Sequence, residues 1–160
     1  MYQLLLLLIF LLPFIASAEE NSVKTIAGDI STRKHETDSE CKFLLANKTI
    51  LTIDCEDSFL PVVVGDFRGK IGLFEQVLVF QENPMGNACN GGALHFIGLH
   101  ENGSYQISKP LDFCGGKAPV IKQQDDSISI IFPGGAPNKG RGKIPTERWS
   151  YRNGEISRVH

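Results

Sequence analysis

Beyond residue 18 the sequence lacks any long apolar run, and it has no large excess of charge of either sign. No stretch there approaches the roughly 20 apolar residues that a membrane-spanning helix needs, so we expect no membrane anchor. The chain carries 16 Lys and Arg against 18 Asp and Glu, a formal net charge of −2. That balance argues against a dedicated nucleic-acid binder, which presents a basic face.

Motifs that carry familiar catalytic or cofactor chemistry are also absent. The sequence has no nucleophile elbow, phosphate-binding loop, metalloprotease helix or dinucleotide fingerprint. It has four cysteines but no Cys-x-x-Cys pair of the kind that zinc modules and redox enzymes use, so we expect no bound metal and no cofactor. An enzyme is therefore the weaker interpretation, although many hydrolases carry none of these motifs.

The chain does begin with the features of an export signal. Residues 2–15 are almost wholly apolar, and the small residues Ala16-Ser17-Ala18 follow, ahead of the charged pair Glu19-Glu20. The apolar segment is too short to span a bilayer. We predict a signal peptide over residues 1–18 and a protein that is secreted or periplasmic.

Two further segments can be separated by composition. Residues 19–40 are polar, mixed in charge and poor in apolar periodicity, which predicts a flexible polar leader. Residues 41–160 are rich in short apolar runs with turn residues between them, and their number suits one domain. We therefore predict a single β-rich domain over residues 41–160.

In an oxidising compartment the four cysteines are expected to form two disulfides. Two equal apolar runs flank Asn47-Lys48-Thr49, and folding the chain about Lys48 pairs Cys41 with Cys55. This register predicts a Cys41–Cys55 disulfide across the hairpin. Cys89 and Cys114 then pair by elimination.

Turn residues predict the other hairpins and the fold class. Asn102-Gly103 and Asn153-Gly154 are the dipeptide that type I′ turns favour, and Asp125-Asp126 marks another turn. About Asn153-Gly154 the strands pair Arg152 with Glu155 and Trp149 with Arg158. The spacing predicts an all-β protein, an antiparallel β-sandwich or small barrel of about nine or ten short strands, stapled by two disulfides.

The segment from Pro133 to Pro145 is the main candidate for recognition. It contains about 13 residues without strand character, and loops of that length are usually functional or disordered. Cations alternate with glycines in it, and two aromatic residues follow, of the types that anchor protein interfaces. The predicted binding residues are Lys139, Arg141, Lys143, Trp149 and Tyr151. A solvated loop beside a core tryptophan is the alternative.

Two other clusters offer less. Asp54, Glu56 and Asp57 resemble the acids of a glycosidase or a calcium site, but a solvated strand end explains them better. His95 and His100 are five positions apart, an odd spacing, within one expected strand, so they should face opposite sides of the sheet. We predict no catalytic residues from either cluster.

Taken together, these patterns favour an exported, non-catalytic binding module that contacts another macromolecule through its loops, such as an inhibitor or immunity-type protein. Its partner would be another extracytoplasmic protein or a surface polymer. The alternatives are a secreted hydrolase with a carboxylate or histidine site and a cell-surface structural or adhesive domain.

Overall fold

The computed structural model describes residues 19–35, 37–86 and 89–159, so the predicted signal peptide lies outside the described residues. In the described part the chain is all-β, and it contains no helix that could cross a membrane. The strands are β1 (Glu19–Thr25), β2 (Gly28–Lys34), β3 (Glu40–Leu45), β4 (Lys48–Asp54), β5 (Ser58–Ile71), β6 (Phe74–Pro84), β7 (Leu94–Leu99), β8 (Tyr105–Ile107), β9 (Val120–Gln124), β10 (Ser127–Phe132), β11 (Glu147–Arg152) and β12 (Glu155–Arg158).

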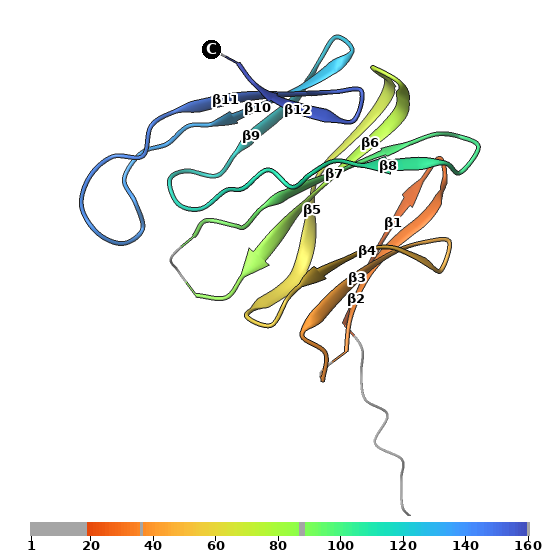
Figure 1. Cartoon of the computed structure of the whole chain (residues 1–160), viewed down its shortest axis with the longest axis horizontal. Coiled ribbons are helices and arrows are strands. Elements are labelled where there is room, and N and C mark those ends of the chain that lie inside the picture. Colours follow the sequence, from red (N-terminus) through yellow and green to blue (C-terminus); the bar gives the residue numbers. More distant parts are fainter. Residues whose placement is uncertain (1–18, 36, 87–88, 160) are drawn as a thin grey trace, which may run out of the picture.

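These strands form three four-stranded antiparallel sheets, each made from one continuous part of the chain (Figure 1). The first sheet has the order β1-β2-β3-β4, the central sheet β5-β6-β7-β8, and the third sheet β12-β11-β10-β9. The all-β class and the two disulfides are confirmed. The prediction of a single sandwich or barrel of nine or ten strands is wrong, because the described chain has 12 strands in three sheets.

The central sheet packs against a neighbouring sheet on both of its faces. On one face Val77 and Val79 pack in a core with Ile128 of the third sheet. On the other face Leu78 packs in a core with Phe43 of the first sheet. A strand buried on both faces has a nearly continuous apolar run instead of an alternating one. The apolar runs in β6 and β7 are nearly continuous in this way. They indicate a sheet that is covered on both faces, which a two-layer sandwich does not provide.

The predicted flexible leader is largely folded. Residues 19–34 form the β1–β2 hairpin, and β2 pairs with β3 from Ile30 opposite Leu45 to Arg33 opposite Lys42. The side chain of Ile30 is buried in the core between the first and central sheets. The prediction failed because polar side chains cover the outer face of this hairpin, and the few apolar ones on its inner face do not make a visible pattern.

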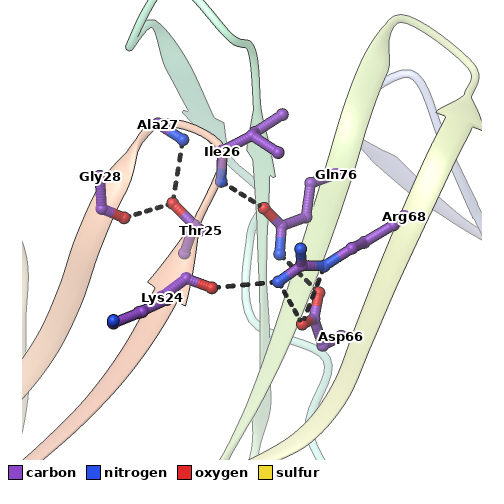
Figure 2. Close-up of polar contacts among 8 residues, drawn as sticks. All are labelled: Lys24, Thr25, Ile26, Ala27, Gly28, Asp66, Arg68 and Gln76. Carbon is purple, nitrogen blue, oxygen red and sulfur yellow. Dashed lines mark hydrogen bonds and ion pairs between the residues drawn. The ribbon is translucent and has the colours of Figure 1, made fainter.

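Hydrogen bonds hold the β1–β2 turn against the central sheet (Figure 2). The buried Gln76 side chain accepts a hydrogen bond from the backbone N–H of Ile26 at 2.9 Å and donates one to Asp66 at 2.5 Å. Arg68 donates to the backbone carbonyl of Lys24 at 3.2 Å and pairs with Asp66 at 3.2 Å. The first and central sheets are thus joined by polar contacts as well as by apolar packing.

The predicted register of the first hairpin is wrong. Cys41 lies opposite Ile53, not Cys55, and a bulge follows Phe43. The turn consists of Ala46 and Asn47, with φ of 48° and 66°, and so begins one residue earlier than predicted. The Cys41–Cys55 disulfide nevertheless forms, and so does the predicted Cys89–Cys114 disulfide.

The other hairpins fit the prediction to different degrees. The last one is confirmed, since Arg152 pairs with Glu155 across a turn in which Asn153 and Gly154 have φ of 54° and 82°. Asp125-Asp126 does connect β9 to β10. The prediction of a type I′ turn at Asn102-Gly103 is wrong. Only Gly103 has a positive φ there, and the loop between β7 and β8 is longer than the two residues of such a turn.

Candidate functional site

The cationic loop, residues 133–145, connects β10 to β11 and projects from the end of the third sheet (Figure 1). Its stem is closed by two backbone hydrogen bonds of 3.0 and 2.8 Å between Gly135 and Ile144. Gly134 sits at the base with φ of 68°, and a Cβ there would meet the carbonyl oxygen of Ile144 at 2.3 Å. Only glycine suits that position. The stem therefore fixes where the loop leaves the sheet.

Hydrogen bonds connect this loop to the segments next to the Cys89–Cys114 disulfide. Asn138 donates a hydrogen bond to the side-chain oxygen of Asn90 at 3.0 Å, and the Asn90 amide donates to the backbone carbonyl of Gly116. Asn90 follows Cys89, whose bond to Cys114 joins the two segments beneath the loop. The predicted disulfide therefore lies next to the predicted recognition loop.

Lys139, Arg141 and Lys143 are all exposed on the cationic loop. The seven salt bridges found among the described residues include none of these three side chains. Exposed cations that have no acidic side chain within ion-pair distance in the described part of the chain are available to an anionic group of another molecule. The structure thus brings the three predicted cations together on one exposed loop.

A groove of about 710 Å³ lies beside Trp149, at the side of the molecule where the central and third sheets end. Residues 106–112 form one wall, and Trp149 with residues 154–156 forms the other. We call this recess the tryptophan groove. Its walls combine apolar side chains such as Leu111 with charged ones such as Lys109, which is typical of a binding site.

The Trp149 side chain is fixed by Glu147 and Arg158. Its ring N–H donates to one Glu147 oxygen at 3.2 Å, and Arg158 donates to the other at 3.0 Å. The Arg158 guanidinium also lies over the indole ring, 5.9 Å from its centroid. A half-buried aromatic ring held in this way can contact a ligand without losing much side-chain entropy.

A second recess of about 170 Å³ links the tryptophan groove to the cationic loop. It shares Asp112 with the groove, and Ile144 and Pro145 of the loop lie in its wall. Glu147 also lines it, and this is the residue that binds Trp149. The foot of the loop and the groove are therefore adjacent, a relationship that the sequence indicated only through its separate residues.

Tyr151 does not belong to this site, which corrects the prediction. Its side chain is fully buried between the central and third sheets, with its ring stacked on Phe96 at 4.9 Å between centroids. Burial raises the pKa of its hydroxyl, which has no hydrogen-bond partner among the described residues. Trp149 and Tyr151 are two residues apart in β11 and so share one face of the sheet, but Tyr151 lies within the core and Trp149 is only partly buried against it.

The site also includes residues that the sequence analysis did not select. The wall residues Lys109, Asp112 and Glu155 come from a connecting segment and from the last strand, and nothing in their local sequence separates them from ordinary surface residues. Only the Asn153-Gly154 turn pointed to this area. The hairpin that it forms places Arg158, at the end of β12, opposite Trp149, and Glu155 and Ile156 in the wall of the groove.

The two other candidate clusters remain separate from this site. Asp54, Glu56 and Asp57 line a small recess at the end of β4, and no group of three metal-ligating side chains occurs in the part of the chain that the structure describes. His95 lies 2.7 Å from Glu82 and near Phe43, on the side of the first sheet. His100 lies by Phe74, on the opposite side, so the two histidines do face opposite layers.

No protein-family model, curated protein or solved structure matches the chain. The three-sheet architecture and the site are therefore described from the geometry of this structure alone. The class that the structure defines is an all-β, disulfide-bonded domain, and its two intramolecular disulfides fit an oxidising, extracytoplasmic location.

Proposed function

We propose that the mature chain is an exported, non-catalytic protein that binds another extracytoplasmic protein through the cationic loop and the tryptophan groove. The observation that carries this proposal is the continuity of the two features. The recess at Asp112 lies between the groove of the fixed tryptophan and the foot of the loop that carries three exposed cations, which have no ion-pair partner among the described residues. Arg and Trp are enriched among the residues that dominate binding energy at protein interfaces.

The proposal includes export and removal of residues 1–18. The small residues Ala16-Ser17-Ala18, expected at a cleavage site, stand directly before Glu19 in the sequence. Cleavage there would leave the whole β1–β2 hairpin in the mature protein. An inhibitor or immunity-type role is consistent with a rigid β scaffold that presents one loop, because such scaffolds commonly carry binding loops.

The electrostatic component predicts how binding responds to salt. Attraction between an exposed cationic loop and an acidic partner surface mainly raises the association rate, and added salt screens it. Contacts in the tryptophan groove should instead govern the dissociation rate, because apolar contacts and desolvated hydrogen bonds are lost only as the complex separates. The two halves of the site therefore have separable kinetic effects.

The test is affinity capture from the native extracytoplasmic fraction with the oxidised mature protein. The Lys139→Ala/Arg141→Ala/Lys143→Ala variant is compared with a charge-matched control, Lys48→Ala/Lys70→Ala/Lys122→Ala, whose side chains are also exposed. The proposal expects one saturable protein partner that the loop variant loses and the control keeps. A ligand that survives complete protease digestion of the extract would be a polymer and would overturn the proposal, as would equal capture by both variants.

A further inference from the structure

Both walls of the tryptophan groove contain the free edge of a sheet. Among the strands that the structure describes, β8 pairs only with β7, and β12 pairs only with β11, so each is an outer strand of its sheet. Residues of both strands line the groove. An edge strand presents a row of unpaired backbone N–H and C=O groups, which can pair with an added strand. The groove is thus bounded by backbone hydrogen-bonding groups as well as by side chains.

The register of β12 shows which of its backbone groups are free. Arg152 and Glu155 flank the two-residue turn, and the backbone N–H of Val159 donates to the carbonyl of Arg148 at 2.8 Å. In an antiparallel pair, hydrogen-bonded and non-hydrogen-bonded residues alternate. The N–H and C=O groups of Ile156 and Arg158 therefore point away from β11.

The opposite wall is poorly suited to pair with a strand. The segment after β8 contains Pro110, which has no N–H, and prolines at a sheet edge oppose strand addition. β12 has no proline, and its four residues give an added strand about 13 Å of contact at roughly 3.3 Å per residue. The wall with Pro110 and Leu111 instead offers an apolar surface to side chains of the occupant.

The charges of the site set the character of the occupant. Arg158 pairs with Glu147, and Glu147 lines the recess that leads to the cationic loop. A strand lying along β12 and continuing past Arg158 would run toward Glu147 and the foot of the cationic loop, which carries Lys139, Arg141 and Lys143. Carboxylates on that continuation would meet three cations that have no ion-pair partner among the described residues.

From these relations we infer that the tryptophan groove takes an extended, carboxylate-bearing peptide segment of the partner, added as a fifth strand beside β12. This inference rests on the proposed function, since it names the part of the protein partner that enters the site. Backbone pairing supplies the affinity, alternate side chains fill the groove beside Trp149, and the carboxylates set the register at the cationic loop.

The test begins with selection from a library of random peptides displayed on phage, using the oxidised mature protein as the target. Binding of the selected peptides is then followed through the emission of Trp149, the sole tryptophan of the chain, with peptides that contain none. The expected peptides carry carboxylates toward one end and change the emission saturably. Failure to enrich any peptide, or enrichment of peptides that leave the emission unchanged, would overturn the inference.

A matched pair of variants tests the backbone contact. Arg158→Ala and Arg158→Pro both remove the contacts of the side chain with Glu147 and Trp149, but only Arg158→Pro also removes the outward N–H. We expect the Pro variant to bind the selected peptides at least tenfold more weakly than the Ala variant, about 1.4 kcal/mol. Equal affinities would exclude addition to β12.

Methylated peptides keep the test valid if the Pro variant fails to fold. A selected peptide is methylated on one backbone nitrogen at a time. Methylation should weaken binding at every second position only, because only every second N–H of an added strand faces β12. Uniform sensitivity would contradict strand addition. If the partner is captured through the loop while these tests fail, the proposed function stands and only this inference falls.

Discussion

The side-chain oxygen of Gln76 accepts a hydrogen bond from the backbone N–H of Ile26 at 2.9 Å, between residues 50 positions apart in the chain. Gln76 is fully buried, and its amide nitrogen donates to Asp66 in the same network. A single side chain thus satisfies the turn of the β1–β2 hairpin and a carboxylate of the central sheet. We regard it as the main polar contact between these two layers.

Replacing Gln76 by alanine should lower the free energy of unfolding by about 2 to 3 kcal/mol. The change leaves the Ile26 N–H without its acceptor, and burying an unsatisfied polar group costs roughly 1–3 kcal/mol in addition to the lost packing. Urea denaturation measures the loss. The control is Gln124→Ala, since Gln124 is exposed on β9, and it should change stability by less than about 0.5 kcal/mol. Equal stability of the two variants would show that the network contributes little.

Removing the Cys41–Cys55 disulfide as the double alanine variant should cost about 3 kcal/mol. The bond closes a loop with a sequence separation of 14, and the chain-entropy model assigns about that value to such a loop. Both sulfurs lie in a small buried cluster with Leu60, so the variant also loses packing there. Thermal denaturation with and without reductant checks the value: reductant should lower the melting temperature of the wild type, which loses two disulfides, more than that of the variant, which loses only Cys89–Cys114. An equal melting temperature for the oxidised and the fully reduced wild-type protein would contradict the expectation.

Tyr151→Phe should be neutral or stabilise the protein by up to about 1 kcal/mol, because it removes a buried hydroxyl that has no partner among the described residues. Tyr151→Ala should instead cost about 3–5 kcal/mol, since the ring stacks on Phe96 in the core. Chemical denaturation of the two variants separates these effects. A large loss in Tyr151→Phe would mean that the hydroxyl makes a contact.

The same hydroxyl predicts an alkaline limit of stability. Burial raises the pKa of Tyr151 in the folded state above the value of about 10 expected in the unfolded chain. Above pH ~10 the unfolded state therefore binds fewer protons than the folded state, and stability should fall by up to about 1.4 kcal/mol per pH unit. Below that pH the contribution is fully present. Tyr151→Phe should show a smaller fall between pH 9 and 11 than the wild type, and parallel curves would contradict the assignment.

The Lys139→Ala/Arg141→Ala/Lys143→Ala variant should fold like the wild type. All three side chains are exposed, and surface changes of this kind mostly cost under about 0.5 kcal/mol each. The loop stem depends on backbone bonds between Gly135 and Ile144 and on Asn138, which the variant keeps. Equilibrium unfolding in denaturant provides the check. A strong loss of stability would mean that the cations have a structural role.

Features decided by neighbouring residues were predictable from the sequence. The Asn153-Gly154 turn fixed the register of the last hairpin, because that dipeptide suits the positive φ values that the turn requires. The first hairpin pairs two to three positions away from the predicted register, because its turn begins at Ala46. Ala46 adopts a positive φ, which its side chain disfavours and the sequence gives no reason to expect.

Features decided by long-range packing were not predictable. The third layer exists because Val77 and Leu78 are buried against different sheets, and a short apolar run does not reveal which partners cover it. The site was predicted in part. The sequence indicated its cations and Trp149, whereas the wall at residues 106–112 joins them only through the tertiary fold.

The central claim is that one partner engages the cationic loop and the tryptophan groove together. The most direct measurement is ¹⁹F NMR of the protein labelled with 5-fluorotryptophan, which gives one resonance because the chain has one tryptophan. We predict that the captured partner shifts the Trp149 resonance saturably, and that the same concentration leaves it unchanged in the Lys139→Ala/Arg141→Ala/Lys143→Ala variant. A partner that binds the wild-type protein without moving this resonance would contradict the account.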